Sequence, residues 1–150
     1  MNINATHSFT AAPPEVWKLL MDPEAIKSCL PGCRELRPID DNRYHAEITI
    51  GVAAVSGSFT ATVVLSELVP PQSYRLSVDA TGKPGFTKGT ALIVLSPVPS
   101  GTEIQVTASA EVGGLIARVG QRLVEGVAKM TMDRFFNCLA ARVVTEGRRT

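Results

Sequence analysis

The sequence predicts an α+β fold in which a curved antiparallel sheet wraps around one long C-terminal helix. Residues 115–146 contain no proline and place apolar side chains three or four positions apart, as one face of an α-helix requires. The segments before them alternate apolar and polar residues, which is the period of a strand. A helix with one apolar face must bury it, and the preceding sheet offers a surface for that. Such a sheet tends to enclose a cavity, where we expect the function to reside.

The N-terminal elements are a strand and two short helices. Residues 3–10 alternate apolar and polar side chains and are expected to form the first strand. Pro13-Pro14 should begin the first helix, because their φ angle is already helical. Asp22-Pro23 begins the second, with an aspartate cap followed by proline in the first helical position. This helix would run to about Ser28 and end in a tight loop at residues 29–33.

A series of hairpins should follow, because apolar residues recur at every second position and the turns between the segments are short. The expected strands are residues 34–39, 42–50, 59–65, 74–80, 86–96 and 104–110. The terminal helix should start after Gly113-Gly114. Its buried stripe is expected to be Ile116, Val119, Leu123, Val127 and Met130, continued by Leu139 and Val143.

Gly120 and Gly126 interrupt this helix, at a cost of about 1 kcal/mol each relative to alanine. Close approach of the helix to the sheet is the favoured explanation. Room for a ligand beneath the helix is the alternative.

Length and charge limit the class of protein. At 150 residues the chain has the length of one domain, which we place at residues 1–150. Fifteen basic and fourteen acidic residues give a net charge of +1, which argues against a nucleic-acid partner. No apolar run of about 18 residues is present, so we expect no transmembrane segment. The N-terminus lacks the pattern of a signal peptide, and three cysteines are an odd number, so a cytoplasmic location is expected.

The sequence carries no pattern typical of catalysis. It has no Gly-x-Ser-x-Gly elbow, no His-Glu-x-x-His and no phosphate-binding glycine loop, so we expect no catalytic residue. Cys29 and Cys33 lie in one loop, but a zinc site needs four donors and Cys138 is distant in the terminal helix. We therefore expect no metal, and structural cysteines without a disulfide.

The two histidines receive different predictions. His7 is in phase with the apolar residues of the first strand and could donate a hydrogen bond to a ligand carbonyl. A hydrogen-bonded core histidine, or one left exposed by strand twist, is the commoner role and stays open as the alternative. His45 is out of phase with its strand, so we expect it on the surface near Glu47 or a residue of a neighbouring strand.

Several motifs resemble a known family. The segment Pro-x-x-Val-Trp-x-x-Leu after the first strand resembles the helix-grip fold of the START and Bet v 1-like (SRPBCC) superfamily. Motifs along nearly the whole chain narrow the resemblance to the family of the G subunit of carbon monoxide dehydrogenase. They are Val16-Trp17 with Leu20 and Asp22-Pro23, Cys29-Leu30-Pro31-Gly32-Cys33, Pro70-Pro71, Gly85-Phe86 with Gly89, and Val112-Gly113-Gly114-Leu115 with Ala117, Val119 and Gly120.

This resemblance implies a non-catalytic accessory protein that is encoded with molybdenum-containing dehydrogenases. It implies recruitment of the oxidoreductase to the inner face of the cytoplasmic membrane, or handling of a lipophilic electron acceptor such as a quinone, with no covalently bound cofactor. The superfamily also contains polyketide cyclases and dehydratases, so an enzyme that uses His7 and Tyr44 is the alternative. A structural adaptor with a filled core is a third reading.

Ligand contacts are expected on the inner face of the sheet and on the helices that cover it. These side chains belong first to the core and become ligand contacts if the terminal helix leaves space beneath it. They are His7, Trp17, Leu30, Tyr44, Phe59, Val78, Phe86, Ala108, Leu115, Val119 and Leu123. We expect the opening between residues 82–89 and the start of the terminal helix, where glycines give the backbone freedom to move.

Overall fold

The computed structural model describes residues 1–51 and 56–149. In chain order its elements are β1 (Asn2–Phe9), α1 (Pro13–Leu20), α2 (Pro23–Cys29), β2 (Cys33–Asp40), β3 (Arg43–Ile50), β4 (Gly57–Val69), β5 (Ser73–Gly82), β6 (Gly85–Val98), β7 (Gly101–Gly113), the 3₁₀ helix η2 (Leu115–Val119) and α3 (Gln121–Arg149). The expected strands and both short helices are therefore present. Asp22 caps α2 as predicted, and its carboxylate accepts a hydrogen bond from the backbone N–H of Glu24 at 3.0 Å.

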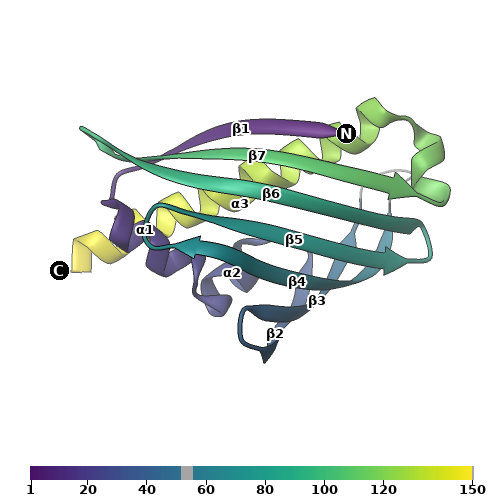
Figure 1. Cartoon of the computed structure of the whole chain (residues 1–150), viewed down its shortest axis with the longest axis horizontal. Helices are drawn as coiled ribbons and strands as arrows, with labels where there is room; N and C mark the ends of the chain where they lie inside the picture. The colour runs from purple at the N-terminus through teal and green to yellow at the C-terminus, as the bar shows by residue number, and fades with distance from the viewer. Residues whose placement is uncertain (52–55, 150) are drawn as a thin grey trace.

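The strands form one antiparallel sheet of seven strands in the order β1-β7-β6-β5-β4-β3-β2. Successive strands from β2 to β7 are neighbours, and β1 closes the other edge beside β7. Figure 1 shows α3 running along one face of this sheet, with α1 and α2 at the end where the chain terminates. The fold is the predicted helix-grip arrangement, in which the curved sheet holds the long terminal helix.

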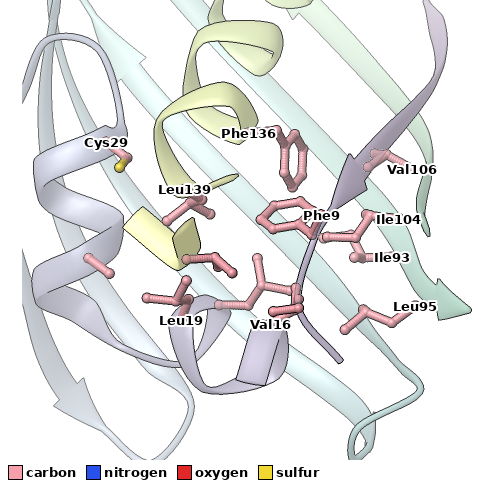
Figure 2. Close-up of a cluster of buried hydrophobic side chains, with 14 of the residues drawn as sticks. Phe9, Val16, Leu19, Cys29, Ile93, Leu95, Ile104, Val106, Phe136 and Leu139 are labelled. Atoms are coloured by element: carbon pink, nitrogen blue, oxygen red, sulfur yellow. The ribbon is translucent and has the colours of Figure 1, made fainter. Parts of the chain in front are cut away.

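The main core lies between α1, α2, the C-terminal half of α3 and the inner faces of β1, β6 and β7. Figure 2 shows Val16 and Leu19 of α1 converging with Phe9 of β1 and Leu139 of α3. Leu139 and Val143 are buried, as the stripe on the terminal helix predicted. Apolar burial at this end fixes where α3 lies on the sheet.

The start of the terminal helix differs from the prediction. Residues Leu115–Val119 form a 3₁₀ helix, and α3 begins only at Gln121. Gly120 separates the two with a φ angle of 99°, a value that a right-handed helix cannot contain.

The interruption also changes which side chains face the sheet. Val124 and Val127 pack on the cluster formed by Phe59 and Ile116, whereas Leu123 is 37% exposed. The prediction that Leu123 belongs to the buried stripe was therefore wrong. Because Gly120 breaks the helix, the phase of the apolar face cannot be carried across it from Ile116.

Close approach to the sheet does not explain the two glycines. A Cβ atom at Gly120 or Gly126 would meet no atom of another residue within 4 Å. The favoured explanation was therefore wrong for both positions. Gly120 is required by its backbone conformation, and Gly126 lies on the exposed side of α3.

The cysteine prediction also needs a correction, because Cys29 and Cys138 form a disulfide. The two residues are 109 positions apart, but α2 packs against α3 and brings their Cα atoms to 5.4 Å, within the usual range for this bond. Cys33 is the free cysteine, and its thiol donates a hydrogen bond to the carbonyl oxygen of Glu35. Burial raises the pKa of the Cys33 thiol.

Candidate ligand cavity

Small side chains line the centre of the inner sheet face. Ala46, Ala61 and Ala80 lie directly opposite one another on β3, β4 and β5, and all three are buried. Helix α3 makes its most extensive contacts with α2, β1 and η2. The centre of the sheet therefore presents short apolar side chains, and fewer contacts of the terminal helix reach it.

A cavity of about 470 Å³ opens at the end of the sheet where η2 meets α3. It lies within the size range of small-molecule sites in proteins. Figure 1 shows this end of the molecule beside the N-terminus and opposite the C-terminus. The residues that line the cavity come from β6, β7, η2, the first turn of α3 and the chain start. They are Met1, Phe86, Ala110, Glu111, Val112, Ala117, Gly120, Gln121 and Val124.

Two features of the backbone create this cavity. The pairing of β1 with β7 ends with hydrogen bonds between Met1 and Ala110, so β7 extends beyond its neighbour and residues 110–112 line one wall. The opposite wall is η2, which is attached to the turn between β5 and β6. The backbone N–H of Ile116 donates to the carbonyl oxygen of Pro84 at 2.7 Å, and the Ile116 side chain is buried against Phe59.

The walls combine apolar side chains with a few polar ones. Phe86, Val112 and Val124 supply apolar surface. Glu111 and Gln121 are exposed at the same cavity, and the Gln121 side-chain amide donates to the Glu125 carboxylate at 2.9 Å. A cavity lined by apolar and polar surface in similar shares suits an amphipathic molecule with an apolar body and a polar end.

The segments that form the cavity also carry exposed apolar side chains. Phe86, Leu115 and Leu123 are 43%, 60% and 37% exposed. Basic residues alternate with them on the same segments and form no ion pair among the residues that the structure describes. We call these six residues the mouth patch: Lys83, Phe86, Leu115, Arg118, Arg122 and Leu123. Exposed apolar side chains that form one surface are typical of an interaction site.

The other predicted contacts are spread over the inner face. Phe59 and Val119 belong to the cluster beneath η2, and Val78 packs beside the three alanines. Trp17 makes an edge-to-face contact with Tyr74, and Ala108 packs against the main core. Leu30 follows α2, and Tyr44 lies partly buried on β3. Of the predicted set, Phe86 lines the cavity described above; ligand contact by any of these residues stays a prediction.

The prediction missed most of the residues that line the cavity. Ala110, Glu111 and Val112 could have been predicted from the greater length of β7 relative to β1. Ala117, Gln121 and Val124 depend on the break at Gly120, for which the sequence offers only the glycine itself.

His7 points inward, as its phase predicted, and lies between β1 and α3. Its ring stacks on Phe136, with ring centroids 4.5 Å apart. Its Nε2 atom is buried and has no hydrogen-bond partner among the described residues, and the Asp133 Oδ1 atom lies 3.6 Å away. Burial lowers the pKa of His7, and the negative charge of Asp133 partly opposes that shift. His7 is therefore neither exposed nor a fully hydrogen-bonded core residue.

Comparison with known proteins identifies the family. The family model of CoxG, the G subunit of carbon monoxide dehydrogenase, matches residues 7–144. The chain belongs to this family. A solved conserved protein from Geobacillus kaustophilus is 36% identical, with a TM-score of 0.93, over 97% of this chain and 96% of that one. The family match runs from the end of β1 through most of α3, so it includes the β7 wall and the η2 wall of the cavity.

More distant structures share the fold. A START superfamily protein from Mycobacterium smegmatis is 16% identical, with a TM-score of 0.75, over 96% of this chain and 97% of that one. A Thermus thermophilus protein is also 16% identical, with a TM-score of 0.72, over 97% and 99% of the two chains. No curated protein matches this sequence. Within the described residues, no helix combines the length and hydropathy needed to cross a bilayer. Family and fold together indicate a ligand-binding accessory protein.

Proposed function

We propose that this protein holds one lipophilic small molecule, such as a quinone, and works beside a molybdenum-containing oxidoreductase of the carbon monoxide dehydrogenase type. The observation that carries the proposal is the cavity of about 470 Å³, lined by apolar and polar surface in similar shares, which opens to the surface beside the start of α3. Removal of apolar surface from water supplies the affinity, at about 25 cal/mol per Å². Glu111 and Gln121 orient the polar end of the molecule.

The mouth patch supports contact with an anionic membrane, from which such a molecule can be taken up. Leu115 and Leu123 are positioned to enter the boundary between headgroups and acyl chains. Lys83, Arg118 and Arg122 contribute attraction to anionic headgroups, which falls as salt concentration rises. Flotation with phosphatidylglycerol vesicles tests this contact. Binding should be lost in a Leu115→Asp, Leu123→Asp double variant and retained with Ile39→Asp, another exposed apolar residue.

A titration with a filled cavity tests ligand binding. Ala117 is exposed and lines the cavity, so a tryptophan there would occupy the space without overpacking the core. Calorimetric titration with a short-chain quinone analogue should show one site in the wild type and none in Ala117→Trp. Thr107→Trp is the control, because Thr107 is exposed near the middle of β7 and does not line the cavity. Equal binding by both variants would place the ligand elsewhere.

A cyclase or dehydratase is the second candidate, because the His7 Nε2 atom lies 3.6 Å from the Asp133 Oδ1 atom between β1 and α3. An imidazole beside a carboxylate can accept and return a proton. The His7→Gln variant distinguishes the two functions. In an accessory protein this change leaves quinone-analogue affinity unchanged, whereas in an enzyme it removes turnover of an apolar polyketide-like substrate that the wild type converts.

A further inference from the structure

A separate group of polar side chains lies on the outer face of the hairpin formed by β2 and β3. Glu35 of β2 and His45 and Glu47 of β3 each offer one donor atom, and these three atoms all lie within 4.8 Å of one another. Ala46, between the two β3 residues, points to the opposite face and is buried among the alanines. The sheet therefore separates this group from the cavity.

An irregularity in the register places Glu35 on the outer face. Cys33 pairs with Ile48, but Glu35 rather than Arg34 pairs with Glu47. One extra residue in β2 thus moves Glu35 to a position directly opposite Glu47, as a β-bulge does. Two like charges directly opposite each other destabilise neighbouring strands. A positive charge between the carboxylates would remove that repulsion.

The basic side chains of the protein neutralise the two carboxylates only in part. The Arg37 Nε atom lies 2.8 Å from the Glu35 carboxylate, so one guanidinium serves one of the two glutamates. The His45 Nε2 atom lies 3.8 Å from the Glu47 Oε1 atom, which is too long for a hydrogen bond. An imidazole nitrogen and a carboxylate oxygen that face each other beyond hydrogen-bond distance leave room for an ion between them.

We propose that Glu35, His45 and Glu47 bind a divalent transition-metal ion, with Zn²⁺ as the representative species. Zinc takes nitrogen ligands at about 2.0–2.1 Å and carboxylate oxygens at about 2.0–2.2 Å, so donors on one ion are about 3.4 Å apart. Rotations of both the Glu35 and the Glu47 side chains would bring the three donors, now within 4.8 Å of one another, to that spacing. Water completes the coordination. The imidazole selects zinc over Mg²⁺, which prefers oxygen ligands alone.

Calorimetric titration of tag-free protein with ZnCl₂ and, separately, MgCl₂ tests the site. The wild type should bind one Zn²⁺ per chain and no Mg²⁺ at the same concentrations. His45→Ala and Glu47→Gln should each lower zinc affinity by at least about tenfold. Asp79→Asn is the matched control, because Asp79 is an exposed acidic residue on the same face that pairs with Lys88. Cys33→Ser tests for capture by the free thiol, and both controls should bind zinc as the wild type does.

The Arg37→Ala variant should not lose zinc affinity, in contrast to His45→Ala and Glu47→Gln. Removal of the guanidinium frees the Glu35 carboxylate, so zinc should bind equally well or more tightly. Circular dichroism of each variant establishes that it is folded. Absence of zinc binding at millimolar concentration would overturn the proposal. It would also fail if His45→Ala bound zinc like the wild type, or if Mg²⁺ bound with equal affinity, because the carboxylates would then attract cations without a site.

Discussion

Ile116 of η2 and Pro84 of the β5–β6 turn are joined by a backbone hydrogen bond of 2.7 Å. This bond and the burial of Ile116 hold one wall of the cavity to the sheet. Gly85 lies at the contact, where a Cβ atom would be 2.2 Å from the carbonyl oxygen of Gly113 and 2.8 Å from Cγ1 of Ile116. The position of η2 therefore depends on the absence of a side chain at Gly85.

Gly85→Ala should displace η2 and weaken ligand binding. Its φ angle of 146° and the backbone oxygen of Gly113 both oppose a side chain there. We expect a loss of about 1–3 kcal/mol in the free energy of unfolding, measured by urea denaturation. Unchanged stability together with unchanged binding of a quinone analogue would contradict this description of the wall.

Gly126→Ala should have the opposite effect. Gly126 lies in α3, and a Cβ atom there would meet no other residue within 4 Å. Alanine favours the helix by about 0.8–1.0 kcal/mol relative to glycine, so the melting temperature should rise. A fall in stability would show that Gly126 approaches another part of the protein.

The two apolar positions at the start of α3 should respond differently to a charge. Val127 is partly buried against the cluster of Phe59 and Ile116, so Val127→Asp removes a carboxylate in part from water and should cost about 1–3 kcal/mol. Leu123 is 37% exposed, and Leu123→Asp should change stability by less than about 1 kcal/mol. Thermal unfolding of both variants measures the difference. An equal loss would mean that Leu123 faces the sheet.

The disulfide between Cys29 and Cys138 should contribute to stability. It joins α2 to α3 across 109 residues, and removal of a native disulfide typically costs about 2–5 kcal/mol. Protein purified without reductant should contain one reactive thiol, Cys33, after unfolding in denaturant. Cys138→Ser should unfold at lower urea concentration. Three thiols in the unreduced wild type would show that the bond does not form.

His7 should make the protein less stable in acid. Burial lowers the pKa of His7 in the folded state below its ordinary value of 6.5. The unfolded chain then binds the proton more readily, so this contribution is present above pH 6.5 and is lost as pH falls toward the folded pKa. Asp133→Asn removes the opposing charge and should steepen the loss. Urea unfolding between pH 7.5 and 5.5 measures how the free energy of unfolding changes with pH. A pH dependence that His7→Gln leaves unchanged would assign the effect to other groups.

Much of the fold could be predicted because local patterns determine it. Alternation in Ile3, Ala5, His7 and Phe9 identified the inner face of β1, and Asp22-Pro23 identified the start of α2. The inward orientation of His7 follows from the same alternation. Family motifs then pointed to the helix-grip arrangement.

The details of the site depend on tertiary structure and could not be predicted in this way. The Cys29–Cys138 pair requires knowledge that α2 packs on α3. The exposure of Leu123 requires the break at Gly120, and the alignment of Glu35 with Glu47 requires a register shift that no local pattern indicates. Asp133, whose carboxylate faces the His7 ring, lies more than a hundred residues away in the sequence.

Native mass spectrometry of protein purified without detergent tests the central claim most directly. The account predicts a species heavier than the bare chain by one apolar molecule, either as purified or after incubation with a short-chain quinone analogue. That species should be absent from Ala117→Trp and present in Thr107→Trp. Only the bare chain in all three proteins after incubation, with the fold intact by circular dichroism, would contradict a ligand-holding role for the cavity.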